Sequence, residues 1–384
     1  MNDDYNASTR RFDETIDEEN SSDSTKYPAD MTSISNYIDS NISAIEYVDS
    51  EDEKRTILIE NEYETMETDE EDDKEMDTEV LCHIMDNIHV PKKQLQQKKK
   101  ETKNEEKKFI SLSDFIIGKP MGAGQFGRVY LAKTREEHFI CCLKMISIKK
   151  LNSHKYYKQL EIEVTLQQKL NHPNILQLYN WFQDKNNVVL ILECALHGSM
   201  SNDMRNEEKK FYDNKKACKY TVQVADALMY CHSLNIIHRD LKTENILLDH
   251  YKNAKLCDFG WSIQTVKNRA TFCGTAEYIP PEMLIENEKV SYGKEVDIWA
   301  LGILIFEMLS GETPFCCTST KAILARVREG RFHMPCDIDS DAKDLIRRLL
   351  KRNPTRRLEL RNVLKHPWIT RHYSGNTTID DESV

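Results

Sequence analysis

Three short polar motifs follow one another at fixed spacing in the second half of this 384-residue chain. They are His238-Arg-Asp-Leu-Lys-Thr-Glu-Asn245, Asp258-Phe-Gly260 and Pro280-Pro-Glu282. In phosphoryl transfer, Asp240 can orient an attacking hydroxyl and accept its proton, and Lys242 can neutralise a phosphate. Asn245 and Asp258 carry the oxygen ligands with which proteins hold Mg²⁺ against phosphates. Chance does not assemble all these spacings, so we expect a fold that brings these groups to a nucleotide.

A glycine-rich segment, Gly122-Ala-Gly-Gln-Phe-Gly-Arg-Val129, lies upstream between two strand-like stretches. Gly122, Gly124 and Gly127 let backbone amides approach a polyphosphate. The same spacing also occurs in dinucleotide-binding loops and in plain hairpins. A dinucleotide loop is disfavoured here because the pattern that follows is that of a strand and not of a helix.

Lys144 ends the next strand-like stretch, Cys141-Cys-Leu-Lys144. It can place an ammonium group beside the α and β phosphates, although an ordinary surface lysine is the alternative. The helical pattern over 156–170 puts Glu163 on the same face as the apolar Leu160. Because an inward carboxylate requires a cation, Lys144 is the expected partner of Glu163.

Charge divides the chain into an acidic front and a basic body. Residues 1–90 contain 28 acidic residues against six basic ones, with only scattered apolar positions. Such a segment cannot bury enough apolar surface to offset its chain entropy, so we expect a disordered, solvated tail. Residues 91–108 hold eight basic and three acidic residues, which fits a nuclear import signal, a chromatin contact or a solvated linker. We expect an acidic extension over 1–108, a folded domain over 109–371 and a tail over 372–384.

The folded body changes its periodicity along its length. Alternating apolar and polar residues over 128–134 and 138–147 predict short strands. Helical patterns dominate later, over 215–234, 296–311, 321–329, 340–350 and 360–364. The expected fold class is α+β, with a small β-rich lobe that carries one main helix and a larger helical lobe.

The eleven cysteines favour a reduced compartment. Their number is odd, no Cys-x-x-Cys occurs, and the adjacent pairs Cys141-Cys142 and Cys316-Cys317 cannot chelate a metal as zinc sites do. We therefore expect cytosolic or nuclear thiols. The longest uncharged apolar runs, 188–192 and 299–306, are far shorter than the ~18 residues of a membrane span, so no membrane segment is expected.

Over residues 109–371 the chain resembles the eukaryotic protein kinases, and within them the Aurora group of mitotic serine/threonine kinases. The Aurora-like residues are Gln167, His172-Pro-Asn-Ile-Leu176, Asp258-Phe-Gly-Trp-Ser262, Cys273-Gly-Thr275, Tyr278-Ile-Pro-Pro-Glu-Met283 and His366-Pro-Trp-Ile369. The resemblance implies a bilobal protein-kinase fold and an enzyme that uses ATP and Mg²⁺ to phosphorylate serine or threonine in proteins. It also implies work in mitotic chromosome segregation, in the nucleus and cytoplasm, at the spindle or centromere.

Two alternatives to this function stay open. A basophilic kinase of another group would need an aromatic anchor after the folded body, which the thirteen residues after Arg371 do not supply. A catalytically silent scaffold of the same fold usually lacks at least one of the motif residues, and all of them are present here. No direct contact with nucleic acid is expected from the kinase domain.

The resemblance implies roles for residues near the adenine. Backbone groups of Glu193 and Ala195 would bond the adenine at the connection between the lobes. Side chains of Val129, Cys142 and Leu247 would sandwich its ring. Cys142 departs from the usual alanine and adds slight bulk.

The resemblance also implies an activation-loop phosphosite at Thr271, where a phosphate would add negative charge that arginines can bind. Arg239 and Arg269 are the expected readers of that phosphate. In the Aurora group a further arginine precedes the inward glutamate of the helix, and here Ile162 takes its place. We therefore expect weaker coupling between the Thr271 phosphate and the helix.

Substrate preference is expected from charge. Glu244 and Glu307 match positions that receive an arginine two residues before the target in basophilic kinases, and paired carboxylates suit a guanidinium group. The alternative is that the Glu307 carboxylate only solvates the buried end of a helix and does not bind substrate. Thr275 would help to select a serine or threonine acceptor. Arg269 lies two residues before Thr271, so autophosphorylation between molecules is expected.

Gln167 indicates an activating partner on the small lobe. In most kinases this position is apolar and stacks in the closed core, so a buried amide without partners would cost about 1 to 3 kcal/mol there. The alternative is that Gln167 bonds a trapped water. Asn180 looks more like the centromeric branch of the Aurora group, which binds an inner-centromere protein. The resemblance thus implies a partner segment of that kind.

Overall fold

The computed structural model describes residues 110–124, 127–152, 154–264, 275–285 and 292–373. The predicted extension over 1–108 and nearly all of the predicted tail lie outside these ranges. Within them, no helix is long and apolar enough to cross a membrane.

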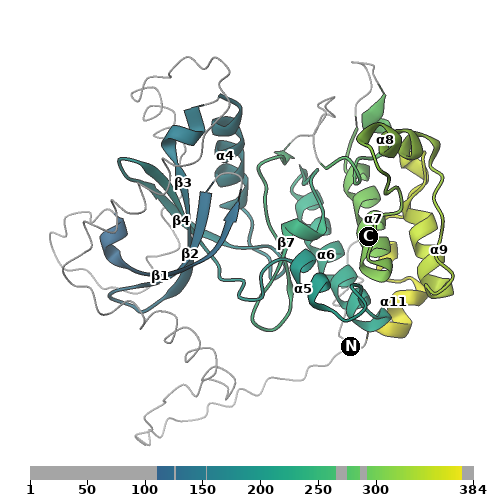
Figure 1. Ribbon diagram of the computed structural model, residues 1–384, viewed down its shortest axis with the longest axis horizontal. Helices are drawn as coiled ribbons and strands as arrows, with labels where there is room; N and C mark the ends of the chain where they lie inside the picture. The colour runs from purple at the N-terminus through teal and green to yellow at the C-terminus, as the bar shows by residue number, and fades with distance from the viewer. Residues whose placement is uncertain (1–109, 125–126, 153, 265–274, 286–291, 374–384) are drawn as a thin grey trace, which may run out of the picture. The chain divides into compact units, whose positions relative to one another are not determined.

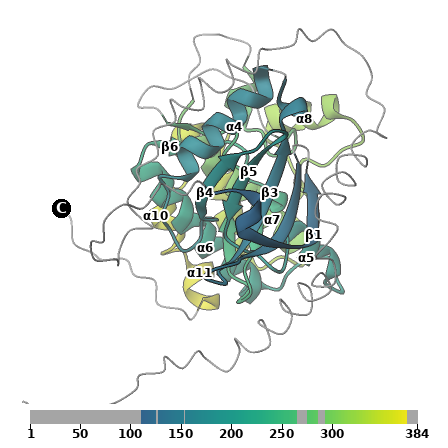
Figure 2. The ribbon, with the colours of Figure 1, turned by 90° about the vertical axis from the view of Figure 1, so that its left-hand side faces the viewer.

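A five-stranded antiparallel sheet forms the first part of the described body (Figure 1). In sheet order its strands are β1 (Phe115–Gly124), β2 (Gly127–Thr134), β3 (Ile140–Ser147), β5 (Asn187–Leu192) and β4 (Leu178–Gln183). The other elements of this part are the 3₁₀ turns η1 (Leu112–Asp114) and η2 (Ile148–Asn152) and the helix α4 (His154–Gln167). Helix α4 lies beside the sheet (Figure 2).

Strand β5 reads as an apolar run because both of its faces are covered. Leu190 lies in a buried cluster that includes Leu160 and Val164 of α4. Its neighbour Val189 lies in a different cluster, together with Phe115 at the start of β1. Alternate side chains of a strand point to opposite faces, so one face of the sheet packs on α4 and the other on the segment around β1.

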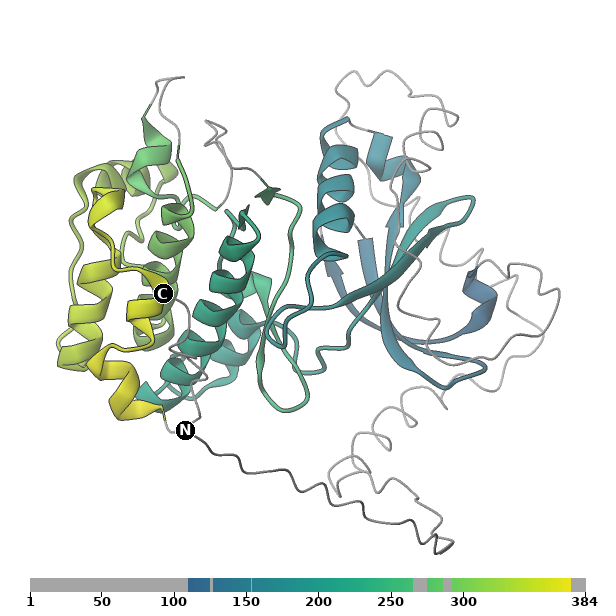
Figure 3. The same cartoon turned by 180° about the vertical axis from the view of Figure 1, so that it is seen from behind.

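Helices dominate the rest of the body (Figure 3). They are α5 (Met200–Asn206), α6 (Asn214–Ser233), α7 (Glu295–Ser310), α8 (Thr320–Glu329), α9 (Ser340–Leu349), α10 (Leu360–Val363) and α11 (Pro367–His372). Helix α7 is buried along nearly its whole length, and its Trp299 ring stacks on Phe315. It ends at Gly311, where φ of 82° requires the left-handed conformation that glycine adopts without strain.

Short ladders hold the segment that carries the polar motifs. The strands are β6 (Ile236–Ile237), β7 (Ile246–Leu248), β8 (Ala254–Leu256) and β9 (Ile263–Gln264), and the 3₁₀ turns are η3 (Thr243–Asn245), η4 (Pro281–Leu284) and η5 (Pro354–Arg356). Strand β6 pairs with β9, and β7 pairs with β8. Because residues 238–245 run from β6 to β7 and residues 257–262 from β8 to β9, the two ladders bring these segments together.

The expected fold is confirmed. The sheet with its single long helix α4 is the small β-rich lobe, and the helices from α5 onward form the larger lobe. The predicted helices over 215–234 and 296–311 differ from the observed α6 and α7 by one residue at each end.

Candidate active site

Lys144 and Glu163 form an ion pair between the sheet and α4. Nζ of Lys144 lies 2.7 Å from Oε1 of Glu163. Lys144 is on β3, which lies between β2 and β5 in the sheet, so its backbone is held on both sides. Burial alone would lower the pKa of Lys144, but the carboxylates of Glu163 and Asp258 outweigh burial and raise this pKa above its usual value. The lysine therefore stays charged, within electrostatic reach of Asp258.

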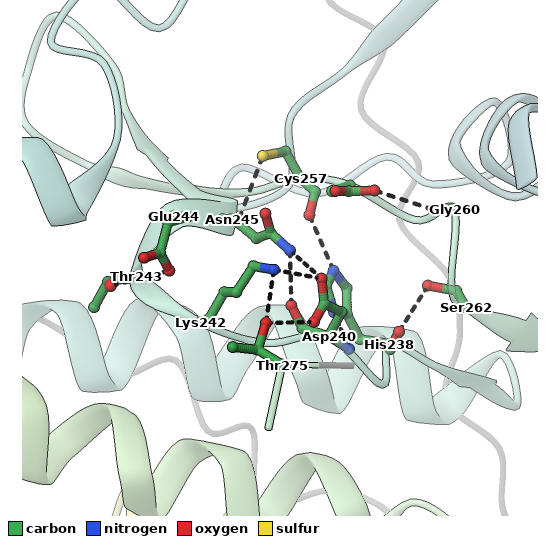
Figure 4. Close-up of polar contacts among 11 residues, drawn as sticks. His238, Asp240, Lys242, Thr243, Glu244, Asn245, Cys257, Gly260, Ser262 and Thr275 are labelled. Atoms are coloured by element: carbon green, nitrogen blue, oxygen red, sulfur yellow. Dashed lines mark hydrogen bonds and ion pairs between the residues drawn. The ribbon is translucent and has the colours of Figure 1, made fainter. Parts of the chain in front are cut away.

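A network of polar side chains surrounds Asp240 (Figure 4). Nδ2 of Asn245 donates to the backbone carbonyl of Asp240 at 2.8 Å and to its Oδ2 at 2.9 Å. Nζ of Lys242 lies 2.9 Å from the same Oδ2 and donates to Oγ1 of Thr275 at 2.8 Å. Oγ1 of Thr275 lies 3.4 Å from Oδ1 of Asp240. Asp240 is buried, so these contacts fix the orientation of its carboxylate.

Asp297 of α7 anchors the backbone at the start of this network. Its Oδ2 accepts the N–H of His238 at 3.0 Å, and its Oδ1 accepts the N–H of Arg239 at 2.9 Å. Nε2 of His232 lies 2.8 Å from Oδ2. Burial alone would raise the pKa of Asp297, but the His232 hydrogen bond and the other contacts hold it below its usual value. Arg239 has a φ of 69°, a strained backbone state that such an anchor can hold.

Asp258 follows β8 and is held by its neighbours. Its own φ is 65°, and the ring of the next residue, Phe259, packs edge-on against the ring of His238 at 4.9 Å. Nε2 of His238 lies 3.0 Å from the carbonyl oxygen of Cys257. The segment is thus fixed on both sides of the Asp258 carboxylate.

The residues present fit a divalent cation that takes most of its ligands from elsewhere. Because Nδ2 of Asn245 is engaged with Asp240, its Oδ1 is the atom left for a ligand, and Asp258 adds a carboxylate. No group of three or more His, Cys, Asp or Glu side chains in the described ranges could hold a metal by itself. Mg²⁺ is commonly bound by one or two protein groups plus phosphates and waters, which agrees with this donor set.

The side chains predicted to sandwich adenine lie together. Val129, Cys142 and Leu247 contribute to one apolar cluster, which also contains Ala195. The N–H of Glu193 donates to the carbonyl of Gln177, and the carbonyl of Ala195 accepts the N–H of Gly198. The backbone groups that remain for a ligand are the carbonyl of Glu193 and the N–H of Ala195.

The glycines of the predicted phosphate loop occupy different surroundings, so the structural reason for a glycine differs between them. Gly124 ends β1 opposite Gly127, and Gly122 pairs with Val129. A Cβ on Gly127 would lie 1.9 Å from the carbonyl oxygen of Met145, so the approach of β3 already excludes a side chain there. Nothing lies within 4 Å of a Cβ on Gly122. Gly127 is therefore needed for sheet packing, whereas Gly122 faces open space that a phosphate could use.

Comparison with known proteins agrees with this geometry. The family described as "Protein kinase domain" matches residues 115–369. The chain is 43% identical to an Aurora kinase of Dictyostelium discoideum, over 69% of this chain and 68% of that protein. It is 40% identical to Aurora kinase C of Mus musculus, over 69% and 95%, and 41% identical to serine/threonine-protein kinase Aurora-1 of Arabidopsis thaliana, over 68% and 88%.

The chain belongs to the Aurora family of serine/threonine protein kinases. It is therefore a protein serine/threonine kinase, which uses ATP and a divalent metal ion and acts on proteins.

In this Aurora-family kinase a buried ion pair braces the segment after residue 275. Nη1 and Nη2 of Arg357 each lie 2.6 Å from one carboxylate oxygen of Glu282. The guanidinium group also lies over the ring of Trp299, 5.0 Å from its centroid. Such a two-pronged contact combines charge with fixed geometry, and it joins the Pro280-Pro-Glu282 motif to α7.

The two glutamates expected to receive a substrate arginine have different surroundings. Glu244 is exposed, whereas Glu307 is bonded to its neighbours: its Oε2 accepts the hydroxyl of Tyr278, and its Oε1 lies 3.3 Å from Oγ1 of Thr243. Burial raises the pKa of Glu307 to about 7, with the hydrogen bonds from Tyr278 and Thr243 opposing this and the charge of Glu244 adding to it. Glu307 therefore titrates near neutral pH.

Of the proposed phosphosite and the two arginines expected to bind its phosphate, only Arg239 lies within the described residues. Thr271 and Arg269 lie outside the described residues. Nε of Arg239 donates to the carbonyl of Trp261 at 2.6 Å, and its Nη1 donates to the hydroxyl of Tyr292 at 3.2 Å. These bonds orient the guanidinium group against the segment that leads to residue 264.

The expectation that the Gln167 amide is buried without partners holds for only one of its two ends. Nε2 donates to the carbonyl oxygen of Leu176 at 2.8 Å, so this end is satisfied. Oε1 is buried and has no hydrogen-bond partner among the described residues. The segment just before β4 presents a backbone carbonyl to this side chain, and a carbonyl can satisfy the amide's donor but not its acceptor.

Some residues of the site were not identified from the sequence. Asp297 was missed, although an acidic residue inside an otherwise apolar helical run is a signal for a buried anchor. Lys255, whose Nζ bonds the Glu193 carboxylate, carries no such signal because it lies in a short strand with ordinary spacing.

Proposed function

We propose that this kinase transfers the γ-phosphoryl group of Mg-ATP to serine or threonine hydroxyls, with Asp240 as the group that orients the hydroxyl and accepts its proton. The observation that carries the proposal is the network around Asp240. Asn245 and Lys242 hold Oδ2, so Oδ1 is the atom directed toward the Thr275 side. A hydroxyl acceptor would take the position next to Oδ1, and the Lys242 ammonium would offset the charge of the transferred phosphoryl group.

The remaining motif residues would bind the nucleotide. Lys144, held by Glu163, would contact the α and β phosphates, and Asn245 with Asp258 would hold Mg²⁺. When bound, Mg²⁺ supplies positive charge against the phosphate oxygens. The adenine and phosphate contacts would come from Gly122, Gly124, Gly127, Val129, Cys142, Glu193, Ala195 and Leu247.

The test replaces the proposed base without changing its size. We expect Asp240→Asn to bind an ATP analogue normally but to lose roughly 100-fold or more in kcat, because general-base catalysis contributes about that much. Asp249→Asn, in the turn after β7, is the matched control and should keep full activity. Normal turnover by Asp240→Asn, measured as phosphate incorporated into a protein substrate, would overturn the assignment.

We further propose a preference for arginine two residues before the target. Glu244 is exposed beside the Asp240 network, and Glu307 lies behind it with a carboxylate that can ionise near neutral pH. A peptide series that varies only this arginine to lysine and alanine tests the proposal. Glu244→Gln should raise KM for the arginine peptide and leave KM for the alanine peptide unchanged.

For regulation we propose that Thr271 is the activating phosphosite and that Arg239 and Arg269 bind its phosphate. Ile162 packs against the apolar cluster of the large lobe and offers no charge, which supports weak coupling from the phosphate to α4. Inactive Asp240→Asn protein mixed with active enzyme should become labelled at Thr271. A less than threefold difference between phosphorylated enzyme and Thr271→Ala would count against a switch.

We also propose an activating protein segment of the inner-centromere-protein type on the small lobe, and a mitotic role at the spindle or centromere, in the nucleus and cytoplasm. The buried Oε1 of Gln167, which has no hydrogen-bond partner among the described residues, supports the proposal of an activating partner. An unsatisfied buried acceptor costs free energy, so the observed position of α4 is less stable than it could be. Kinase assays with and without such a segment test this.

We propose that residues 1–108 are a disordered extension, 109–371 the kinase domain and 372–384 a tail, and limited proteolysis can check these boundaries.

A further inference from the structure

Three sulfur atoms meet beside the proposed adenine site. Sγ of Cys142 lies 3.2 Å from Sγ of Cys194 and 3.7 Å from Sδ of Met121. Cys142 is buried, Cys194 is half-buried and Met121 is exposed. The two thiols are therefore in direct contact, with the thioether on the side that opens to solvent.

The backbone fixes this arrangement. Cys142 lies on β3 directly opposite Leu192, the last residue of β5. Cys194 comes two residues later, next to Ala195, and all four belong to the apolar cluster under β3 or pack against it. The thiols are thus held by the sheet and by the connection between the lobes, not by a mobile surface segment.

We propose that Cys142 and Cys194 form a dithiol site for trivalent organoarsenicals, and that its occupation excludes the adenine ring. Trivalent arsenic is a soft, thiophilic centre that binds two neighbouring thiols far more tightly than one. Placing the dithiol in the nucleotide site rests on the proposed function; the dithiol itself rests on the sulfur contacts alone.

The reaction balances without any further reagent. The As=O group of an organoarsenic oxide condenses with both thiols: two S–H bonds break, two As–S bonds form, and the oxygen leaves with both protons as water. Arsenic stays trivalent and neither sulfur is oxidised. The hydrogen bond with Cys142 and burial raise the pKa of Cys194, so this group is a protonated thiol near neutral pH, which is the form that the condensation consumes.

Other cysteines compete for the same reagent. Cys257 packs against the same apolar cluster, but its Sγ lies 3.3 Å from the carbonyl oxygen of Asn245. Cys316 and Cys317 are adjacent in sequence, and Cys316 is exposed. A test must therefore identify which two sulfurs the arsenic joins.

The test uses the reduced full-length protein and phenylarsine oxide. One equivalent is added, and peptide mapping by mass spectrometry then locates the phenylarsenic bridge. We expect the bridge between Cys142 and Cys194, reversed by an excess of a small dithiol and not by a monothiol. Cys194→Ser should raise the concentration for half-occupation roughly 100-fold, since the second bond forms at high effective concentration. Cys316→Ser is the matched control and should leave the Cys142–Cys194 bridge unchanged.

A second arm separates the dithiol from the nucleotide site. A saturating non-hydrolysable ATP analogue should prevent the bridge, and the bridged protein should lose analogue binding. A bridge only at Cys316–Cys317, a bridge through Cys257, or unchanged binding to Cys194→Ser would overturn the dithiol. A Cys142–Cys194 bridge that forms equally well with bound analogue would overturn the exclusion of adenine. The proposed catalytic function is tested separately, by the Asp240→Asn assay on untreated enzyme.

Discussion

Single buried charges at this site fix the backbone more than they provide chemistry. Asp297 accepts two backbone N–H groups from the His238-Arg239 segment and a third bond from His232. Its side chain is fully buried, so removing the carboxylate would deprive all three groups of this acceptor. The position of Asp240 thus depends on a residue that touches no reacting atom.

We expect Asp297→Ala to lower the free energy of unfolding by roughly 3 kcal/mol or more, because it leaves several buried donors without their acceptor and each such donor costs about 1 to 3 kcal/mol. Urea denaturation measures this change. Glu359→Ala is the control, because Glu359 is exposed and pairs only loosely with the exposed Arg361, a contact worth less than about 1 kcal/mol. Equal effects of the two substitutions would show that Asp297 is not an anchor.

The titration of Glu307 leads us to expect that substrate binding depends on pH. Burial raises its pKa to about 7, so the carboxylate is largely protonated below this pH and charged above it. KM for a peptide with arginine two residues before the target should therefore fall as pH rises from about 6 to about 8. Glu307→Gln should remove this trend, and KM for the alanine peptide should not follow it. A flat profile in the wild type would contradict the role of Glu307 in binding arginine.

At the scale of elements, the Lys144–Glu163 ion pair joins α4 to strand β3 of the sheet. Glu163→Gln leaves the Lys144 ammonium without its carboxylate, and losing one partner of a buried hydrogen-bonded pair costs about 2 to 5 kcal/mol. We expect kcat/KM for ATP to fall roughly 30-fold or more. Glu161→Gln, on the same helix but off its inward face, should stay within about twofold. Steady-state kinetics of both variants decide between a positioning role and a merely structural one.

Local periodicity made the α4 prediction possible and also sets its limit. The helical spacing of Leu160 and Glu163 gives the inward face, and the need of a buried carboxylate for a cation gives Lys144 as its partner. The contacts of Asp297, or of Cys142 with Cys194, depend instead on how distant segments pack. The positive φ of Arg239 could not be predicted either, because arginine has no preference for the left-handed backbone region.

Across the whole molecule, backbone hydrogen bonds around β8 join the two lobes, in addition to the apolar contacts of α4. The N–H of Leu176 donates to the carbonyl of Leu256, and the N–H of Leu256 donates to the carbonyl of Asn174. The side chains of Glu193 and Lys255 pair beside them. The groups proposed to bind phosphates are divided between the lobes, with Lys144 on the sheet and Asp258 after β8. A nucleotide with its metal should therefore stabilise both lobes together.

This coupling can be measured by thermal unfolding with a non-hydrolysable ATP analogue. At 100 times its Kd, a ligand that binds only the folded state adds about 2.7 kcal/mol, which corresponds to roughly 5 to 10 °C in Tm. We expect the wild type to show this shift with Mg²⁺ and a smaller one when the metal is chelated. Asp258→Asn should show the smaller shift in both cases, because the amide is a weaker ligand for a hard cation. Asp249→Asn should behave as the wild type, and a full Mg²⁺-dependent shift in Asp258→Asn would remove Asp258 from the metal site.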